Sequence, residues 1–481
     1  MRRAVLGCCA VAARAQLPAV ISEAAPHVHP RALAELETFF APGGPHESFA
    51  VRIEEGCVGG AFPTYDWRRP QRRDALDAKW GLESLLAARL ARSRWFTTSE
   101  AAPVALVAFR PRTSDRAALT RCRAHLEATS SGKRFWFAAS TDRGRCCDGG
   151  QLRDPGLLNH HFLVTSGERR RGAWLFREHN TKHAWRAPPS RTTAPRLRCF
   201  DQSNDVALPP PAFLRGLHVK RDERRDARAR NATRPFLAVH AEGGVAPPEY
   251  DLRRLLTARW APDWWANARN ASWAGHPALL IRKAMARAAH DDALFASKYC
   301  LVVEGFAPWT PRLSEAIGAG CVPAILSPAL LPPFAGVLRW RDFAVILKRA
   351  DVANLPAVLE KYDHAALHAN LLRVRRLLSF VAAGRDTEDD ALPLVVFEMW
   401  RRTKRRGAPY AAGTATALAA VEATGVSSDV EPAAVPFACA ADGASCVYAV
   451  RGTAWNCSRR TKMACGCAPA PAGPRRPRGG P

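Results

Sequence analysis

The chain has 481 residues, of which 47% are hydrophobic, and it carries a formal net charge of +26. This length and composition exclude an intrinsically disordered protein and suggest two large domains with smaller additions. The positive charge would suit nucleic acid, an anionic membrane or acidic sugars, although arginine beside abundant alanine and proline is equally typical of a GC-rich genome. No RNP-like aromatic pattern, zinc-finger spacing or basic zipper is present, so we predict no nucleic-acid partner.

The N-terminus predicts entry into the secretory pathway. Residues 1–15 carry two arginines, then a short apolar run and a small-x-small triplet, which is typical of a signal peptide or short anchor and too short for a membrane span. Glycosylation sequons at Asn231, Asn270 and Asn456 agree with this interpretation. We expect a Golgi location, luminal or membrane-associated, or secretion.

In the first half, the stretch 79–98 has leucines and alanines at helical spacing and predicts a helix. Short apolar segments between glycine, proline or charged turns predict strands at 103–109, 134–140, 160–166 and 205–211. The prolines that end the last of these segments close a first sheet. We therefore expect an N-terminal domain over residues 16–211.

The second half alternates strands with helices. Predicted strands are 234–244, 299–303, 322–327 and 343–347, and predicted helices are 277–298, 364–382 and 389–404. This alternation is typical of a parallel sheet covered on both faces. It predicts a C-terminal domain over 212–405, followed by a small-residue linker over 406–435.

A cysteine-rich tail over residues 436–481 ends the chain. We interpret it first as a small disulfide-stapled module, because fourteen cysteines suit an oxidising compartment. A zinc module is the weaker alternative, since no paired C-x2-C spacing occurs. Five of the fourteen cysteines lie in this tail: Cys439, Cys446, Cys457, Cys465 and Cys467.

One stretch, GFAPWTPRLSEAIGAGCVPAIL at 305–326, carries the chemistry. It follows a predicted strand of a parallel sheet, where ligands bind beyond the carboxyl ends of the strands. Gly305 allows close backbone approach, Thr310 can cap the helix that follows, and Pro311 suits its first turn. Arg312 supplies a guanidinium fork for phosphate oxygens.

Glu315, one turn further along this helix, can accept hydrogen bonds from vicinal hydroxyls such as those of a ribose. With Arg312 on a diphosphate, the two side chains describe a nucleotide-sugar pocket. A salt-bridged helix start in an ordinary α/β domain explains the same residues equally well.

The stretch SKYCLVVEGFAPWTPRLSEAIGAGCVPAIL resembles the signature of the exostosin-type glycosyltransferases, and most closely that of the plant xylan xylosyltransferase-like branch. The family pattern is approximately G-x-A-P-W-S-P-R-L-x-E-A/S-x-x-x-G-C-x-P-V-I, and only Thr310 and Ala324 depart from it. Weaker similarity occurs at 80–109, 132–146 and 198–211.

The resemblance implies an α/β fold of the GT-B class, in which two Rossmann-like domains face each other across a cleft. The C-terminal domain would hold the nucleotide sugar and the N-terminal domain the acceptor. The implied enzyme is an inverting, metal-independent hexosyl- or pentosyltransferase. It would move a sugar from a UDP-sugar to a glycan or glycoprotein acceptor, alone or with Golgi complex partners, and it would need no cofactor.

The resemblance also implies roles for the residues of the signature. Thr310 and Arg312 would assist departure of the diphosphate without a metal ion. Glu304, Gly305 and Trp309 would contact the donor, although Trp309 could equally wedge the loop. Glu315 would hold the ribose.

The resemblance leaves the general base unassigned. Asp142 matches the aspartate of a family His-Asp pair, but Thr141 replaces the histidine. His160 and His161 at a predicted strand start are substitutes. The same departures favour an alternative function, a catalytically inactive exostosin-like protein that acts as a glycan-binding lectin or a complex scaffold.

Overall fold

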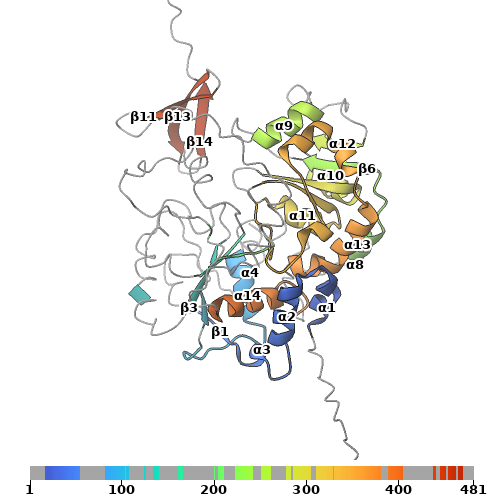
Figure 1. The fold of residues 1–481 in the computed structure, drawn as a ribbon. Coiled ribbons are helices and arrows are strands. Elements are labelled where there is room, and N and C mark those ends of the chain that lie inside the picture. The colour runs from blue at the N-terminus through green and yellow to red at the C-terminus, as the bar shows by residue number, and fades with distance from the viewer. Residues whose placement is uncertain are drawn as a thin grey trace, which may run out of the picture. The chain divides into compact units, whose positions relative to one another are not determined.

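The computed structural model describes the chain in segments, and Figure 1 shows their elements. The described residues are 17–54, 82–102, 104–107, 124–125, 134–139, 161–165, 200, 204–210, 223–241, 251–261, 278–282, 285–304, 310–328, 330–380, 388–404, 437–439, 445–450, 453–461 and 464–469.

The first sheet has five parallel strands in chain order, β1-β2-β3-β4-β5. The strands are β1 (Val51–Ile53), β2 (Val104–Val107), β3 (Arg134–Ala139), β4 (His161–Val164) and β5 (Val206–Ala207). The last four lie within segments predicted as strands. The described residues of β2 and β4 are all buried, as expected for a parallel sheet.

Helix α4 (Leu82–Leu90) contacts β3 and is shorter than the predicted helix over 79–98. Beyond Leu90 the chain turns, because both the amide and the hydroxyl of Ser93 donate to the Leu90 carbonyl oxygen, at 2.9 and 2.7 Å. These short-range bonds replace the i to i−4 pattern that would continue the helix.

The second sheet has the order β10-β9-β8-β6-β7, and all of its pairs are parallel. Its strands are β6 (Phe236–Ala241), β7 (Leu279–Arg282), β8 (Ser297–Val303), β9 (Val322–Leu326) and β10 (Val345–Ile346). Numbered within this half, the order is 2-1-3-4-5, a doubly wound arrangement. Its connections change direction between β6 and β8, which is where such sheets bind ligands.

The predicted helix over 277–298 is wrong in its first part. The structure has strand β7 there and begins helix α10 only at Arg287, ending it at Phe295. The run ALLI is too short for periodicity to separate strand from helix. Pairing with β6 decides for the strand, because it buries Leu279, Leu280 and Ile281 in the sheet.

Most of the remaining helices of this half lie around the second sheet in Figure 1, whereas the last of them contacts α4. They are α8 (Glu223–Asn231), α9 (Asp251–Trp260), α11 (Arg312–Gly318), α12 (Leu355–Leu359), α13 (His364–Val374) and α14 (Leu392–Lys404). Short 3-10 helices are η7 (Trp340–Asp342), η8 (Arg349–Asn354) and η9 (Arg375–Leu378). The helices predicted over 364–382 and 389–404 are thereby confirmed, with shorter bounds.

An N-terminal helical segment packs against the second half of the chain. It comprises α1 (Ala19–Ala24), η1 (Ala25–His27), α2 (Pro30–Phe39) and α3 (Pro45–Ser48). Helix α1 contacts α13, and an isolated antiparallel bridge joins Val28 to Leu338. The rings of Phe39 and Phe397 meet edge to face at 5.7 Å. These contacts join the start of the chain to α13 and α14.

The tail is a separate unit with an antiparallel sheet in the order β11-β12-β13-β14. Its strands are β11 (Phe437–Cys439), β12 (Ser445–Val450), β13 (Thr453–Thr461) and β14 (Ala464–Pro469). Disulfide pairing in the tail and the domain boundaries at 211 and 405 stay predictions. The predicted α/β class is confirmed by the two parallel sheets, and the facing of two domains across a cleft stays a prediction.

Candidate functional site

The carboxyl edge of the second sheet gathers polar side chains on either side of the change in direction. Strand β8 runs directly into Glu304, and its neighbour β9 runs into Ser327. The Ser327 hydroxyl donates to Glu304 Oε2 at 2.8 Å. This bond joins the two loops that leave the sheet and orients the Glu304 carboxylate, which is half-buried.

Helix α11 follows this loop, and Pro311 stands at its N-cap instead of in its first turn. The expected capping by Thr310 is weak, because the Arg312 amide donates to Thr310 Oγ1 at 3.4 Å, and no side chain caps the helix at Pro311 itself. The helix has seven residues. Charged side chains, more than the helix end, must therefore supply the electrostatics of this site.

Arg312 and Glu315 form an ion pair along α11. The Arg312 Nη1 to Glu315 Oε2 distance is 2.5 Å. Glu315 is fully buried, whereas 30% of the Arg312 side chain is exposed. The salt bridge considered in the sequence interpretation is thus present. The buried Glu315 carboxylate orients the partly exposed Arg312 guanidinium. Contact of Glu315 with a ribose stays a prediction.

A hydrogen bond joins α11 to the first half of the chain. The Ser314 hydroxyl donates to the carbonyl oxygen of Pro210 at 2.6 Å. Pro210 belongs to the proline run after β5, where the sequence predicted the end of the N-terminal domain. The bond fixes the middle of α11 to that run.

A second guanidinium, that of Arg253 on α9, reaches the same edge of the sheet. Its Nη2 donates to the carbonyl oxygen of Val303, the last residue of β8, at 3.4 Å. Burial first, and then the nearby Arg312 cation, lower the pKa of Arg253 to about 10, while Glu304 acts to raise it. The two arginines and Glu304 therefore share one electrostatic environment.

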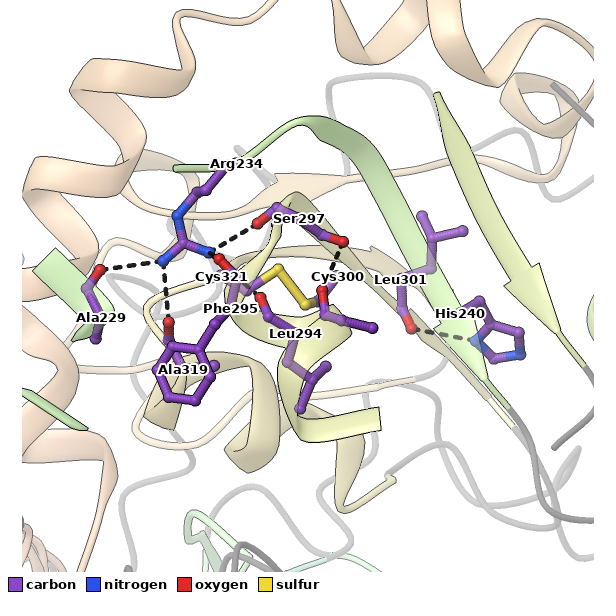
Figure 2. The surroundings of a disulfide bond; sticks show 11 residues. Ala229, Arg234, His240, Leu294, Phe295, Ser297, Cys300, Leu301, Ala319 and Cys321 are labelled. Carbon is purple, nitrogen blue, oxygen red and sulfur yellow. Dashed lines mark hydrogen bonds between the residues drawn. A yellow bond between two sulfur atoms is a disulfide. The ribbon is translucent and has the colours of Figure 1, made fainter. Parts of the chain in front are cut away.

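His240 lies on β6 and is 4% exposed. Burial, and then the charges of Arg253 and Arg312, lower the pKa of His240 to about 3. Its Nδ1 lies 3.4 Å from the Leu301 carbonyl oxygen (Figure 2), and since a carbonyl only accepts, Nδ1 carries the proton. His240 is therefore a neutral imidazole beside two cations.

The sequence interpretation missed Arg253, His240 and Ser327 as members of this edge. His240 and Ser327 had a usable signal, because a polar residue at the carboxyl end of a buried parallel strand points to the ligand edge. Arg253 had none, since one arginine in a basic helix is not distinguishable from its neighbours by sequence. Only the fold brings it to Val303.

A disulfide closes most of the signature segment into a loop. Cys300 on β8 is bonded to Cys321, just before β9, across a sequence separation of 21 (Figure 2). Both residues are buried. Glu304, Arg312 and Glu315 lie inside this loop, so the bond limits how far their backbone can move.

Arg234 fixes the far end of α11. Figure 2 shows its guanidinium pointing at a ring of backbone carbonyls. The acceptors are the carbonyl oxygens of Ala229, Leu294, Phe295, Ser297 and Ala319, at 2.8 to 3.3 Å. They include the ends of α8, α10 and α11, where a cation complements the helix dipoles. Arg234 is a structural anchor for the site.

Three predicted site residues, Gly305, Trp309 and Asp142, lie outside the described residues, as does His160. His161, a substitute for the base, is buried on β4. Its ring stacks on Trp136 at 4.4 Å, and its Nδ1 bonds to the Asn204 carbonyl oxygen at 3.0 Å. These contacts give His161 a packing role.

The second sheet thus defines an α/β domain with charged, anion-compatible side chains at its ligand-binding edge. Residues 158–362 match the family model described as the exostosin GT47 domain. This match supports the resemblance of the signature to the exostosin-type glycosyltransferases.

Plant glycosyltransferases are among its relatives. The chain is 29% identical over 175 residues to the probable glycosyltransferase At5g03795 of Arabidopsis thaliana, covering 36% of this chain and 30% of that protein. It is 37% identical over 81 residues to the probable beta-1,4-xylosyltransferase IRX10L of the same plant, covering 17% and 19%. The chain thus matches only a minor part of the length of these relatives.

Among solved structures, the pneumococcal O-GlcNAc transferase GtfA in complex with UDP and GlcNAc is similar at 10% identity. The match covers 59% of each chain with a TM-score of 0.27. In the part of the chain that the structure describes, no helix is long and apolar enough to cross a membrane.

Proposed function

We propose that this protein is an inverting, metal-independent glycosyltransferase that moves a sugar from a UDP-sugar to a glycan or glycoprotein acceptor. One observation carries the proposal: the Arg312–Glu315 pair, anchored in a buried carboxylate, lies at the carboxyl edge of the second sheet inside an exostosin GT47 domain. A guanidinium in that position suits a diphosphate.

In the proposed reaction, the acceptor hydroxyl attacks the anomeric carbon as the bond to UDP breaks. The charge that develops on the departing diphosphate is stabilised by Arg312, which Glu315 holds in place. The hydroxyl proton passes to a general base, for which Asp142 remains the candidate. Glu304, Gly305, Trp309 and Thr310 are proposed donor contacts.

Calorimetry of UDP binding in EDTA tests the donor site. We expect micromolar binding by the intact chain and at least about a tenfold loss in Glu315→Gln, because Arg312 loses its anchor. Glu360→Gln is the matched control, since Glu360 is exposed and remote in sequence. Absence of UDP binding by the intact chain would reject the transferase and favour the lectin or scaffold function.

Transfer itself needs a second assay. Incubation with a panel of UDP-sugars and glycan acceptors should release UDP, and Asp142→Asn should abolish that release while leaving UDP affinity unchanged. If the intact chain binds UDP but releases none from any donor, the donor site is retained without catalysis. That result would favour the inactive alternative.

We also propose a secretory-pathway location. Two described features support it: the Cys300–Cys321 disulfide suits an oxidising compartment, and the Asn231 sequon exposes both Asn231 and Thr233. Expression in a eukaryotic secretory host followed by glycosidase digestion should remove a glycan from the peptide that contains Asn231. Thr233→Ala should lack that glycan and Thr233→Ser should keep it. A chain retained in the cytosol with Asn231 unmodified would count against the location.

A further inference from the structure

We propose that Arg253 is a second diphosphate-binding guanidinium, which acts with Arg312 on the two phosphate groups of the donor. The inference rests on the proposed function and assigns to that site a residue outside the signature segment. Arg253 comes from α9, more than fifty positions before Arg312 in the sequence.

The first support is position. Helix α9 follows β6, and β6 and β8 flank the point where the sheet changes direction. Arg253 crosses from α9 to the end of β8, where its Nη2 donates to the Val303 carbonyl oxygen at 3.4 Å. This bond lies one residue before Glu304, at the start of the signature loop. A guanidinium carried there is placed at the ligand edge of a doubly wound sheet.

The second support is the arrangement of charge around Arg253. Its pKa is lowered first by burial and then by Arg312, while Glu304 acts in the opposite sense. Glu315 pairs with Arg312, and Glu304, which accepts from the Ser327 hydroxyl, acts on Arg253. Two partly buried guanidiniums repel each other, and an anion with two phosphate groups would relieve that repulsion.

The third support is the protonation state of His240, on which the charges of Arg253 and Arg312 act. A protonated imidazole there would add a third positive charge to a buried site. The lowered pKa of His240 avoids this, with both arginines contributing to the lowering. Among the described side chains whose charges act on His240, Arg253 and Arg312 are therefore the cations.

A purely structural role for Arg253 makes a different prediction. If Arg253 served only to hold the end of β8, its loss would weaken every ligand of the site to a similar degree. If it binds phosphate, its loss weakens the charged ligand alone. The ratio of UDP affinity to uridine affinity separates the two roles, because uridine carries no phosphate.

The test uses the full-length chain with UDP and uridine as probes, with affinities measured by calorimetry and ligand-observed NMR. Arg253→Met should weaken UDP binding roughly 10- to 100-fold, as expected for a lost charge-assisted contact, and leave uridine affinity unchanged. Arg253→Lys should restore part of the loss, since lysine keeps the charge without the fork. Arg254→Met, an exposed neighbour on the same helix, is the control and should bind UDP normally.

Two results would overturn the inference. One is unchanged UDP affinity in Arg253→Met, and the other is an equal loss for UDP and uridine. Both require an intact chain that binds UDP, so they leave the proposed function standing. Failure of the intact chain to bind UDP would instead reject the proposed function and this inference together. Should the methionine variant fail to fold, the lysine variant provides the same comparison.

Discussion

Gly320 shows how a single residue position limits the site. It follows α11 with φ of +64°, and a Cβ there would lie 2.9 Å from the Ala229 carbonyl oxygen and 3.3 Å from Arg234 Nη2. Glycine tolerates this left-handed backbone at no steric cost. The turn from α11 to Cys321 therefore requires glycine at position 320.

Substitution of Gly320 by alanine should lower the free energy of unfolding by about 2 to 4 kcal/mol, from backbone strain plus displacement of Arg234. Gly43→Ala is a matched control, because Gly43 has φ of +68° and nothing within 4 Å of the added Cβ. We expect about 1 kcal/mol there. Urea unfolding measures both, and equal losses would contradict the steric part of this account.

His240 predicts a pH dependence of stability. Its folded pKa of about 3 lies below the ordinary value of 6.5, so the unfolded chain takes up a proton first as the pH falls. Stability should therefore decline from pH 6.5 downward, by about 2 kcal/mol at pH 5 from this residue. In His240→Gln that part of the decline disappears. Urea midpoints at pH 7 and pH 5 measure it, and an identical decline in both proteins would refute the assignment.

At this scale the sequence predicted the residues of the signature and little else. Glu304, Thr310, Arg312 and Glu315 could be named because they follow one strand in a recognisable run. Arg253 reaches the edge from another helix, so its place depends on packing that no local pattern encodes.

The element that holds the site is the disulfide-closed loop from the end of β8 to the start of β9. Chain entropy gives a cross-link of about twenty residues a stabilisation of about 3 kcal/mol. The Cys300→Ala, Cys321→Ala double variant should lose about that amount and bind UDP more weakly than the intact chain. Chemical denaturation checks the first expectation, and calorimetry the second. A double variant with unchanged stability would show that the bond adds nothing to the loop.

Among the elements, buried strands of the second sheet were the most predictable, since β6, β8 and β9 are apolar runs bounded by turns. The region of β7 and α10 failed because a short apolar strand next to a helix gives one continuous helical-looking pattern. Pairing with β6, a long-range contact, makes residues 279–282 a strand instead of the start of a helix. Sheet order was equally beyond local pattern, although it is what locates the ligand edge.

At the scale of the whole molecule, a buried ion pair joins the first sheet's helix to the C-terminal helices. Arg89 on α4 lies 2.6 Å from Asp390, and both side chains are at most 1% exposed. Asp390 also accepts from the Leu392 amide at 2.8 Å, at the start of α14. The pair therefore connects α4 with α14.

Arg89→Met should cost about 3 to 5 kcal/mol, because it leaves the Asp390 carboxylate buried without its cation. The Arg89→Met, Asp390→Leu double variant should recover much of the loss, since an apolar pair needs no compensation there. Urea unfolding of the two variants and the intact chain supplies the comparison. If the single variant is as stable as the intact chain, the pair does not connect the two helices energetically.

The central claim is that the carboxyl edge of the second sheet binds a nucleoside diphosphate, and hydrogen–deuterium exchange of the intact chain with and without UDP tests it most directly. We predict slower exchange in peptides that contain the end of β8, α11 and the start of α9, with β2 to β4 of the first sheet unchanged. Protection confined to the first sheet or to the tail, or none at saturating UDP, would contradict the claim.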